Sequence, residues 1–206
     1  MTDLLPLFLN LTGRAVVLVG GGRVASAKLV QLLAVGADVT VVAPEIAAEI
    51  SDRSDQIAIR QRAFEPSDLD AAWLVVAAAT PDVNRAVAVA AEVRRLFVNA
   101  VDDPANATAY LSGVVRRDGV TIAISTSGEA PALTALLREG LDALLPRDLS
   151  AWIERARAER GAWRRDAIPM DQRKPRLLTA LNAIYGSKWE SADGVPWLHA
   201  PEDSWL

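Results

Sequence analysis

Short apolar runs and stretches with helical periodicity alternate along the first half of the chain. Ala15–Val19 and Trp73–Ala79 are continuous apolar runs, which is typical of strands covered on both faces of a sheet. Val24–Val35 instead carries apolar residues at helical spacing, and Gly36 is a typical helix end. This alternation predicts βαβ units, and therefore a parallel sheet with right-handed crossovers. The same criteria predict strands at Asp38–Ala43, Ala58–Arg62 and Leu96–Val101 and a helix at Asn84–Arg95.

The pattern changes after Asp103. Ala109–Arg116 and Val120–Ser125 are strand-like runs on either side of Asp118-Gly119, which is a favoured hairpin turn. A helix is predicted over Glu129–Leu145, and further helices are predicted from Arg147 onward. The helical pattern becomes weaker over residues 167–175, AIPMDQRKP, and a polar tail follows Gly186. We therefore expect an α/β fold with a Rossmann-like parallel sheet over residues 1–112, a small α+β region over 113–146 and a helical C-terminal domain over 147–206.

The amino-acid composition excludes or disfavours several kinds of chemistry that depend on cysteine or histidine. The chain has 206 residues and a net charge of −4, without cysteine and with a single histidine, His199, which we expect on the surface. Disulfides, Cys nucleophiles and two-His metal sites are therefore excluded or hard to build. The mild acidity does not favour nucleic-acid binding, and the N-terminal apolar run is broken by Pro6 and Asn10. We expect a soluble, cytoplasmic protein without nucleic-acid or membrane partners.

The first predicted strand is followed directly by a glycine-rich loop. Residues 20–25, Gly-Gly-Gly-Arg-Val-Ala, match G-x-G-x-x-A between a strand and a helix. Gly20 allows the tight turn, Gly22 lets a pyrophosphate approach the backbone, and Ala25 lets the helix pack close to the strand. The helix N-terminus offers free N–H groups to phosphates. The pattern predicts a bound dinucleotide, with another nucleotide-like ligand or a structural turn as alternatives.

The choice between NAD and NADP depends on the end of the second strand. Glu45 lies one or two residues past the usual place of the ribose-binding acid, so it either binds ribose or caps the next helix. No arginine stands at this strand end to receive a 2′-phosphate, although Arg23 is a competing candidate. The sequence therefore favours NAD.

Asp102, in Asp102-Asp103-Pro104, either belongs to a turn that ends a strand or is a carboxylate that accepts a proton, since no His or Cys lies near it in the sequence. It follows a predicted strand, where side chains reach the crevice at the carboxyl ends of a parallel sheet. We expect Asp102 and Asp103 not to form a metal site, since neighbouring strand residues point to opposite faces. Asn99 either orients this base, contacts the cofactor or belongs to ordinary strand pairing, and Thr80 either lines the site or caps a helix.

A second group of polar residues opens the helix after the hairpin. Thr126-Ser127-Gly128-Glu129 has the spacing of a capping box. The segment either caps the helix, lines a dimer crevice or binds substrate carboxylates through Ser125, Thr126, Ser127 and Gly128. Arginines in the C-terminal region are further candidates for carboxylate binding, with solvated helix faces as the alternative: Arg155, Arg160, Arg164 and Arg165.

Four segments, in this order, resemble one known family. They are LPLFLNLTGRAVVLVGGGRVASAKLVQLLAVGADVTVVAP, LVVAAATPDVNRAV, FVNAVDDP and GVTIAISTSGEAPALTALLRE. Together they resemble the precorrin-2 dehydrogenase/sirohydrochlorin ferrochelatase family, the N-terminal module of siroheme synthases, over about residues 4–146. Ala100 stands where valine is usual in that family, and Ser127 where glycine is common.

The resemblance implies NAD-dependent dehydrogenation of precorrin-2 to sirohydrochlorin, with insertion of Fe²⁺ in some members. It also implies a homodimer, with residues 113–146 as the dimerisation region, and a catalytic role for Asp102. The cofactor-binding candidates from motif and resemblance together are Gly20, Gly21, Gly22, Arg23, Val24, Ala43, Pro44, Glu45, Thr80 and Asn99. An NAD-binding sensor module and another Rossmann oxidoreductase remain as alternative functions.

Overall fold

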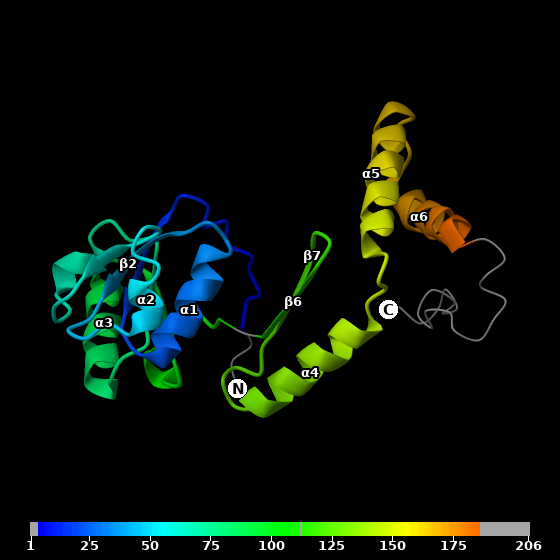
Figure 1. Cartoon of the computed structure of the whole chain (residues 1–206). Coiled ribbons are helices and arrows are strands. Elements are labelled where there is room, and N and C mark those ends of the chain that lie inside the picture. The colour runs from blue at the N-terminus through cyan, green and yellow to red at the C-terminus, as the bar shows by residue number, and fades with distance from the viewer. Residues whose placement is uncertain (1–3, 112, 186–206) are drawn as a thin grey trace. The chain divides into compact units, whose positions relative to one another are not determined.

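The computed structural model describes residues 4–111 and 113–185, which form two compact units (Figure 1). The first unit consists of residues up to Leu111 together with Ser125–Ala130. The second consists of residues 113–124 and the described residues from Pro131 onward. The predictions for His199 and for the tail after Gly186 fall outside the described residues.

A five-stranded parallel sheet forms the centre of the first unit, in the order β3-β2-β1-β4-β5. This confirms the predicted Rossmann-like arrangement. The strands are β1 (Ala15–Val19), β2 (Asp38–Val42), β3 (Ala58–Arg60), β4 (Leu74–Ala77) and β5 (Phe97–Ala100). The connections contain helices α1 (Arg23–Leu33), α2 (Ala48–Ser51) and α3 (Pro81–Val93), and the 3₁₀ turns η1 (Pro66–Leu69) and η2 (Pro104–Asn106).

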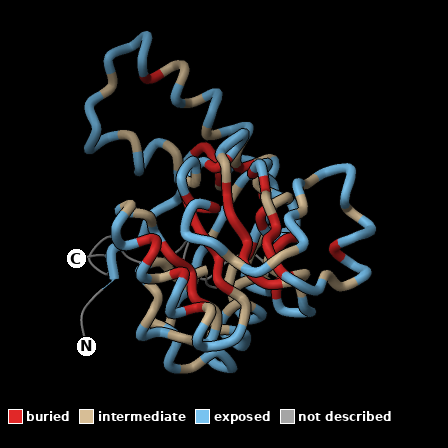
Figure 2. The backbone as a smooth tube through the Cα atoms, turned by 90° about the vertical axis from the view of Figure 1, so that its left-hand side faces the viewer, coloured by how far each residue is buried: buried red, intermediate tan, exposed pale blue. Residues whose placement is uncertain are grey.

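Both faces of the sheet are covered, which explains why its central strands are apolar without alternation. Along β1, Val16 and Leu18 pack in a cluster with Leu29 of α1, whereas Val17 and Val19 pack in a second cluster with Val87 of α3. Successive strand residues point to opposite faces, so Val16 to Val19 each pack into one of the two clusters. The buried residues accordingly concentrate along the strands (Figure 2).

The second unit begins with an antiparallel hairpin of β6 (Gly113–Arg117) and β7 (Val120–Ile124). Asp118 and Gly119 have φ values of 48° and 87°, which confirms the predicted turn. Helices α4 (Pro131–Leu144), α5 (Leu149–Arg165) and α6 (Met170–Tyr185) follow. Leu149, Trp152 and Leu181 form a small core between α5 and α6. Across the described residues, every helix is too short or too polar to traverse a lipid bilayer.

Two predicted boundaries in this part of the chain are wrong. The strand expected from Ala109 begins at Gly113, because the N–H groups of Thr108 and Ala109 donate to the carbonyl oxygen of Val98 and fasten this segment to β5. The loosening expected over 167–175 is found at 167–169 but is incorrect from Met170 onward, where α6 begins and includes Pro175. The partly buried Leu177 packs into the α5–α6 core, and this packing outweighs the cost of an internal proline.

Candidate functional site

Two backbone contacts hold the glycine loop. Gly20 has a φ of +128°, and a Cβ atom there would overlap the carbonyl oxygen of Ala78. A Cβ on Gly21 would overlap the carbonyl oxygen of Glu45, and the N–H of Ala47 donates to the Gly21 carbonyl at 2.8 Å. The loop is therefore pressed against the segments that follow β4 and β2, and only glycine fits at these two positions.

Gly22 differs from its two neighbours, because a Cβ there would meet no atom within 4 Å. It is the N-cap residue of α1, and no side chain caps this helix end. The space in front of Gly22, beside the first-turn N–H groups of α1, is thus open. Ala25, on the side of α1 that faces the core, is fully buried. Open space, uncapped N–H groups and the positive end of a helix fit the pyrophosphate of a dinucleotide.

Ala43, Pro44 and Glu45 lie between the glycine loop and the end of β3. The N–H of Ala43 donates to the carbonyl of Arg60 at 3.3 Å, and Nε2 of Gln61 donates to the carbonyl of Pro44 at 3.4 Å. The Glu45 side chain is exposed. It lies three residues after the end of β2, slightly past the place where a ribose-binding acid is expected in this fold.

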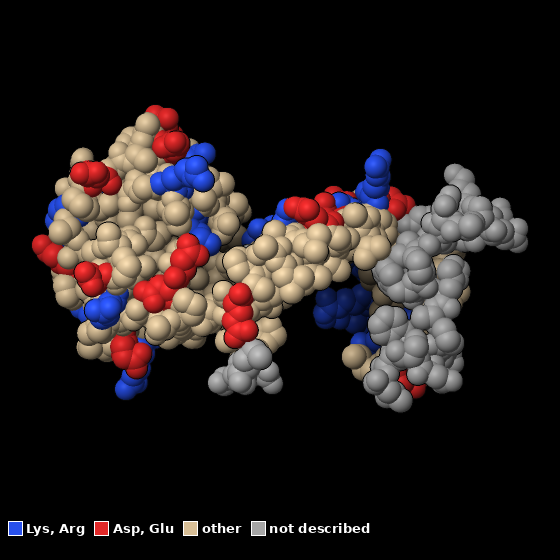
Figure 3. Space-filling view, turned by 90° about the horizontal axis from the view of Figure 1, so that it is seen from below, with Lys and Arg blue, Asp and Glu red and all other residues tan. Residues whose placement is uncertain are grey.

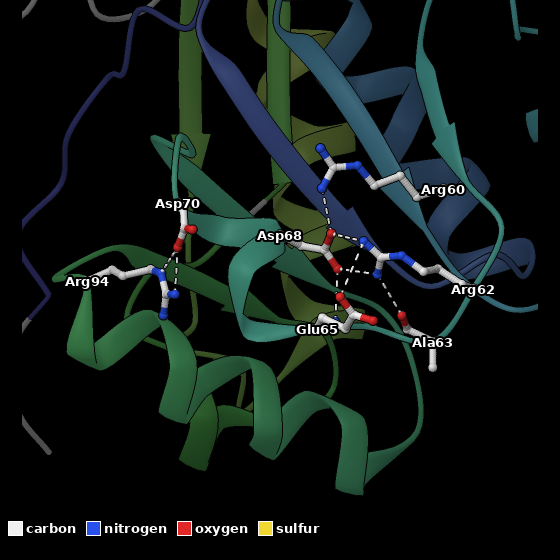
Figure 4. A network of polar contacts seen from close by, with 7 residues as sticks. All are labelled: Arg60, Arg62, Ala63, Glu65, Asp68, Asp70 and Arg94. Carbon is white, nitrogen blue, oxygen red and sulfur yellow. Dashed lines mark hydrogen bonds and ion pairs between the residues drawn. The ribbon is translucent and has the colours of Figure 1, made fainter.

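Two arginines also lie at this strand end, which the sequence analysis missed. In the pairing of β2 with β3, Arg60 is opposite Val42, and Arg62 follows two residues later. Both guanidinium groups bind the carboxylate of Asp68, whose side chain is fully buried (Figure 4). Arg62 makes a two-pronged contact, at 2.8 Å to Oδ2 and 2.6 Å to Oδ1. Both charges are therefore already engaged within the protein.

Burial raises the pKa of Asp68, but hydrogen bonds outweigh it and lower the pKa to about 2. The donors are Arg62, the backbone N–H of Glu65 and Arg60. Because the folded-state pKa lies below the ordinary value, this carboxylate stabilises the fold above pH 4, and its contribution is lost as the pH falls toward 2.

A cavity of about 600 Å³ lies at the carboxyl ends of β4 and β5. It is lined by Val24 of α1, by the β4–α3 connection and by the β5–η2 turn, so three elements of the first unit converge there. Its lining residues are Val24, Ala78, Ala79, Pro81, Asn84, Arg85, Val101, Asp102, Asp103, Ala105 and Asn106.

Asp102 and Asp103 both line this cavity. The premise that they stand on a strand is wrong, because β5 ends at Ala100 and Asp102 has a left-handed φ of 55°. Asp103 accepts a hydrogen bond from Nδ2 of Asn106 at 2.8 Å, whereas no described residue donates one to the exposed Asp102 carboxylate. An unpaired carboxylate on a cavity wall is available to accept a proton from a bound molecule.

Lys28 lies one helical turn beyond Val24, on the same face of α1. Burial lowers the pKa of this half-buried ammonium group, and the negative charge of Asp102 acts in the opposing direction. Lys28 therefore interacts electrostatically with Asp102. The sequence analysis did not identify Lys28. The spacing of four residues between Val24 and Lys28 on a predicted helix was the available signal.

Asn84 and Asn99 are buried side chains with structural contacts. Oδ1 of Asn84 accepts the N–H of Ala79 at 3.1 Å, which fixes the β4–α3 connection. Nδ2 of Asn99 donates to the carbonyl of Ala109 at 3.0 Å, while its buried Oδ1 has no partner among the described residues. Thr80 is exposed at the N-cap position of α3, and its side chain makes no capping bond. Neither Asn99 nor Thr80 lines the cavity.

The capping box expected at Thr126–Glu129 is not formed. Ser127 and Gly128 have φ values of 55° and 82°, which a helix does not accept, so α4 begins only at Pro131. Oγ1 of Thr126 instead accepts the N–H of Ala130, and Oγ of Ser125 accepts that of Ser127. Gly128 lies against Pro104 of η2 and against Tyr110, outside the residues that line the cavity.

Within the described ranges, no group of three or more His, Cys, Asp or Glu side chains is arranged to hold a metal ion. The charged residues of the site are instead the two aspartates, Lys28 and Arg85. Arg85 was also missed by the sequence analysis, because nothing in its neighbours identified which face of α3 meets the cavity.

The strand order, the glycine loop after β1 and a cavity at the strand ends define a Rossmann-type dinucleotide-binding protein. Comparison with family models agrees. Residues 7–113 match the family described as "Putative NAD(P)-binding", and residues 117–144 match "Sirohaem biosynthesis protein central". The first match spans just over half of the chain, so the chain belongs to this NAD(P)-binding family, and the match to the siroheme central segment follows it directly, as in the resemblance that its sequence motifs indicated.

Several curated relatives are named siroheme synthase. Siroheme synthase 3 of Aeromonas hydrophila is 43% identical over 72% of this chain and 32% of its own length. Siroheme synthase of Photorhabdus laumondii is 41% identical over 79% of this chain and 34% of its own length. Siroheme synthase of Zymomonas mobilis is 35% identical over 93% of this chain and 42% of its own length. The chain thus spans about a third to two fifths of the length of these relatives.

A solved structure titled "SirC, precorrin-2 dehydrogenase" matches with a TM-score of 0.65 and 22% identity. The match covers 95% of this chain and 96% of that one. This likeness establishes a shared fold.

Asp68→Asn should lower the free energy of unfolding at pH 7 by about 2–3 kcal/mol, because a shift of about two pKa units corresponds to about that energy. Chemical denaturation from pH 7 to pH 2 measures the effect. The wild-type protein should lose more stability than the variant between pH 4 and 2. Asp70→Asn is the matched control, since the carboxylate that binds Arg94 is 65% exposed, and it should cost less than about 1 kcal/mol. Equal losses for the two variants would contradict this account.

Proposed function

We propose that this protein catalyses the NAD-dependent dehydrogenation of precorrin-2 to sirohydrochlorin. The observation that carries the proposal is that Val24, in the first turn of the glycine-loop helix, and the unpaired carboxylate of Asp102 line the same cavity. A dinucleotide on the glycine loop and a proton acceptor are thereby neighbours. The names of the siroheme synthase relatives and of the matched precorrin-2 dehydrogenase structure support this substrate.

The residues proposed to hold the cofactor are those around the glycine loop. Gly20, Gly21 and Gly22 present the backbone to the pyrophosphate, with Arg23 and Val24 in the first helical turn, and Ala43, Pro44 and Glu45 hold the ribose end. The engagement of Arg60 and Arg62 by Asp68 favours NAD over NADP, because both guanidinium groups are already bound to a buried carboxylate and are less available for a 2′-phosphate. When bound, NAD supplies the acceptor for a hydride.

Asp102 is proposed to accept the proton that leaves the substrate together with the hydride. Its carboxylate lines the cavity and accepts no hydrogen bond from a described residue, so its lone pairs are available. Lys28 interacts electrostatically with this carboxylate from the neighbouring turn of α1. Ser125–Gly128 is proposed to contact substrate from the segment that packs on Pro104 and Tyr110.

Asp102→Asn should abolish most turnover while leaving the fold and the affinity for NAD⁺ unchanged. Asparagine tolerates the left-handed backbone that residue 102 adopts, so the change removes the base without straining the turn. Loss of a general base should lower kcat by about 10²–10⁴-fold. The measurement is NADH absorbance after addition of precorrin-2, with NAD⁺ affinity determined in parallel.

Asp103→Asn is the matched control, because that carboxylate is bonded to Asn106. It should retain turnover within a few-fold of wild type. Near-normal turnover by Asp102→Asn would remove Asp102 from the mechanism, and NAD⁺ binding without reduction by the wild-type protein would favour a sensor module. Addition of Fe²⁺ after sirohydrochlorin has formed tests metal insertion in the same cuvette.

A homodimer is the proposed assembly, with α4 as its contact. None of the described residues of α4 is buried, and Leu133, Leu136, Leu137 and Leu144 are between 42% and 65% exposed. The space-filling view shows a largely uncharged surface along this helix (Figure 3). An exposed leucine stripe at helical spacing is typical of a helix that packs against another copy.

Leu136→Glu should convert the dimer to monomer, because it places a charge in the centre of an apolar contact. Sedimentation velocity at micromolar concentration measures the change. Val93→Glu is the control, since Val93 is 80% exposed at the end of α3. A wild-type protein that sediments as a monomer, or a Leu136→Glu variant that stays dimeric, would contradict the proposed contact.

A further inference from the structure

Arg85 is the one cation among the described residues that line the cavity with Asp102. Val24, Pro81 and the alanines of the wall are apolar, and Asp102 and Asp103 are the other ionisable groups of the lining. Precorrin-2 carries acetate and propionate side chains, so a substrate of this class would meet two negative charges and one positive charge on the cavity lining, since Lys28, which interacts with Asp102, is not among the lining residues. Carboxylates of the substrate require a cation to offset the repulsion of the aspartates.

The backbone that carries Arg85 is fixed by its neighbours. Pro81 begins α3 with a restricted φ, and the buried Asn84 binds the N–H of Ala79. Arg85 is therefore attached to a rigid helix start rather than to a loose loop.

Its guanidinium group remains available for a ligand. Its closest ion-pair contact is Asp82, at 3.7 Å between NH1 and Oδ1, and the two side chains are 67% and 93% exposed. A pair of this length and exposure contributes little and is easily exchanged for a better partner. A guanidinium fork binds a carboxylate through two parallel hydrogen bonds, so a substrate carboxylate is such a partner.

We propose that Arg85 binds a carboxylate side chain of the tetrapyrrole substrate and thereby holds the ring system against Asp102. This inference rests on the proposed function, and it assigns a specificity role to a residue of that site. The competing anion is a phosphate of the dinucleotide. The substrate is favoured because the backbone N–H groups of the glycine loop already offer phosphate contacts, whereas Arg85 stands on α3 and lines the same cavity as both aspartates.

Arg85→Gln should raise the KM for precorrin-2 by about tenfold, with kcat within about twofold of wild type and the KM for NAD⁺ unchanged. The KM of Arg85→Lys for precorrin-2 should lie between the values of the wild type and Arg85→Gln, because lysine keeps the positive charge but cannot form the two parallel hydrogen bonds of a guanidinium. The KM difference between wild type and Arg85→Gln should shrink at high salt. Arg53→Gln, which removes one positive charge away from the cavity, is the matched control and should leave both KM values unchanged.

The outcomes distinguish a substrate carboxylate from a dinucleotide phosphate as the ligand of Arg85, and they distinguish failure of the Arg85 proposal from failure of the proposed function. A higher KM for NAD⁺ with an unchanged KM for precorrin-2 would assign Arg85 to the cofactor and overturn the inference, as would unchanged values for both. If the wild-type protein does not oxidise precorrin-2, the proposed function fails by itself. Binding of uroporphyrin, a carboxylate-rich tetrapyrrole, measured by tryptophan fluorescence quenching then tests Arg85 independently. Equal affinity of wild type and Arg85→Gln for uroporphyrin would overturn it.

Discussion

The close approach of three backbone segments at the glycine loop organises the whole site. Gly20 lies against the carbonyl of Ala78, and Gly21 lies against the carbonyl of Glu45. Any side chain at these two positions would push apart the segments that follow β1, β2 and β4. Because these segments are held together by backbone contact, the start of α1, the ribose end and the cavity wall stay next to one another.

The polar groups around this centre divide into bonded and unbonded ones, and that division assigns their roles. Arg60, Arg62 and Asp68 satisfy one another, so they stabilise the sheet edge and leave little free charge for a ligand. Asp102 accepts no hydrogen bond from the described residues, and the guanidinium of Arg85 has only a weak, exposed partner. Asp102 and Arg85 are therefore the charged groups of the cavity lining that lack a strong internal partner, whereas Asp103 is bonded to Asn106, and a bound molecule would supply the missing contacts.

Local patterns predicted much of the fold, and long-range pairing explains what they missed. The glycine loop, the buried strands and the Asp118-Gly119 turn depend on neighbouring residues, so their sequence signals were sufficient. The position of Arg60 beside β2 depends on strand register, and the position of Arg85 depends on which face of α3 meets the cavity. The spacing of Thr126 to Glu129 favoured a helix cap, but the left-handed backbone of Ser127 and Gly128 overrides that preference. Likewise, packing between α5 and α6 accommodates Pro175 within a helix.

The most direct test of a dinucleotide resting on the glycine loop is calorimetric titration of NAD⁺ into the wild-type protein and into Gly22→Val. Nothing in the fold lies within 4 Å of a Cβ at Gly22, and its φ of −91° suits any residue, so the variant should unfold at the wild-type temperature. The added side chain would fill the space assigned to the pyrophosphate, and NAD⁺ affinity should fall at least about a hundredfold. Unchanged NAD⁺ affinity in a folded Gly22→Val variant would contradict the account.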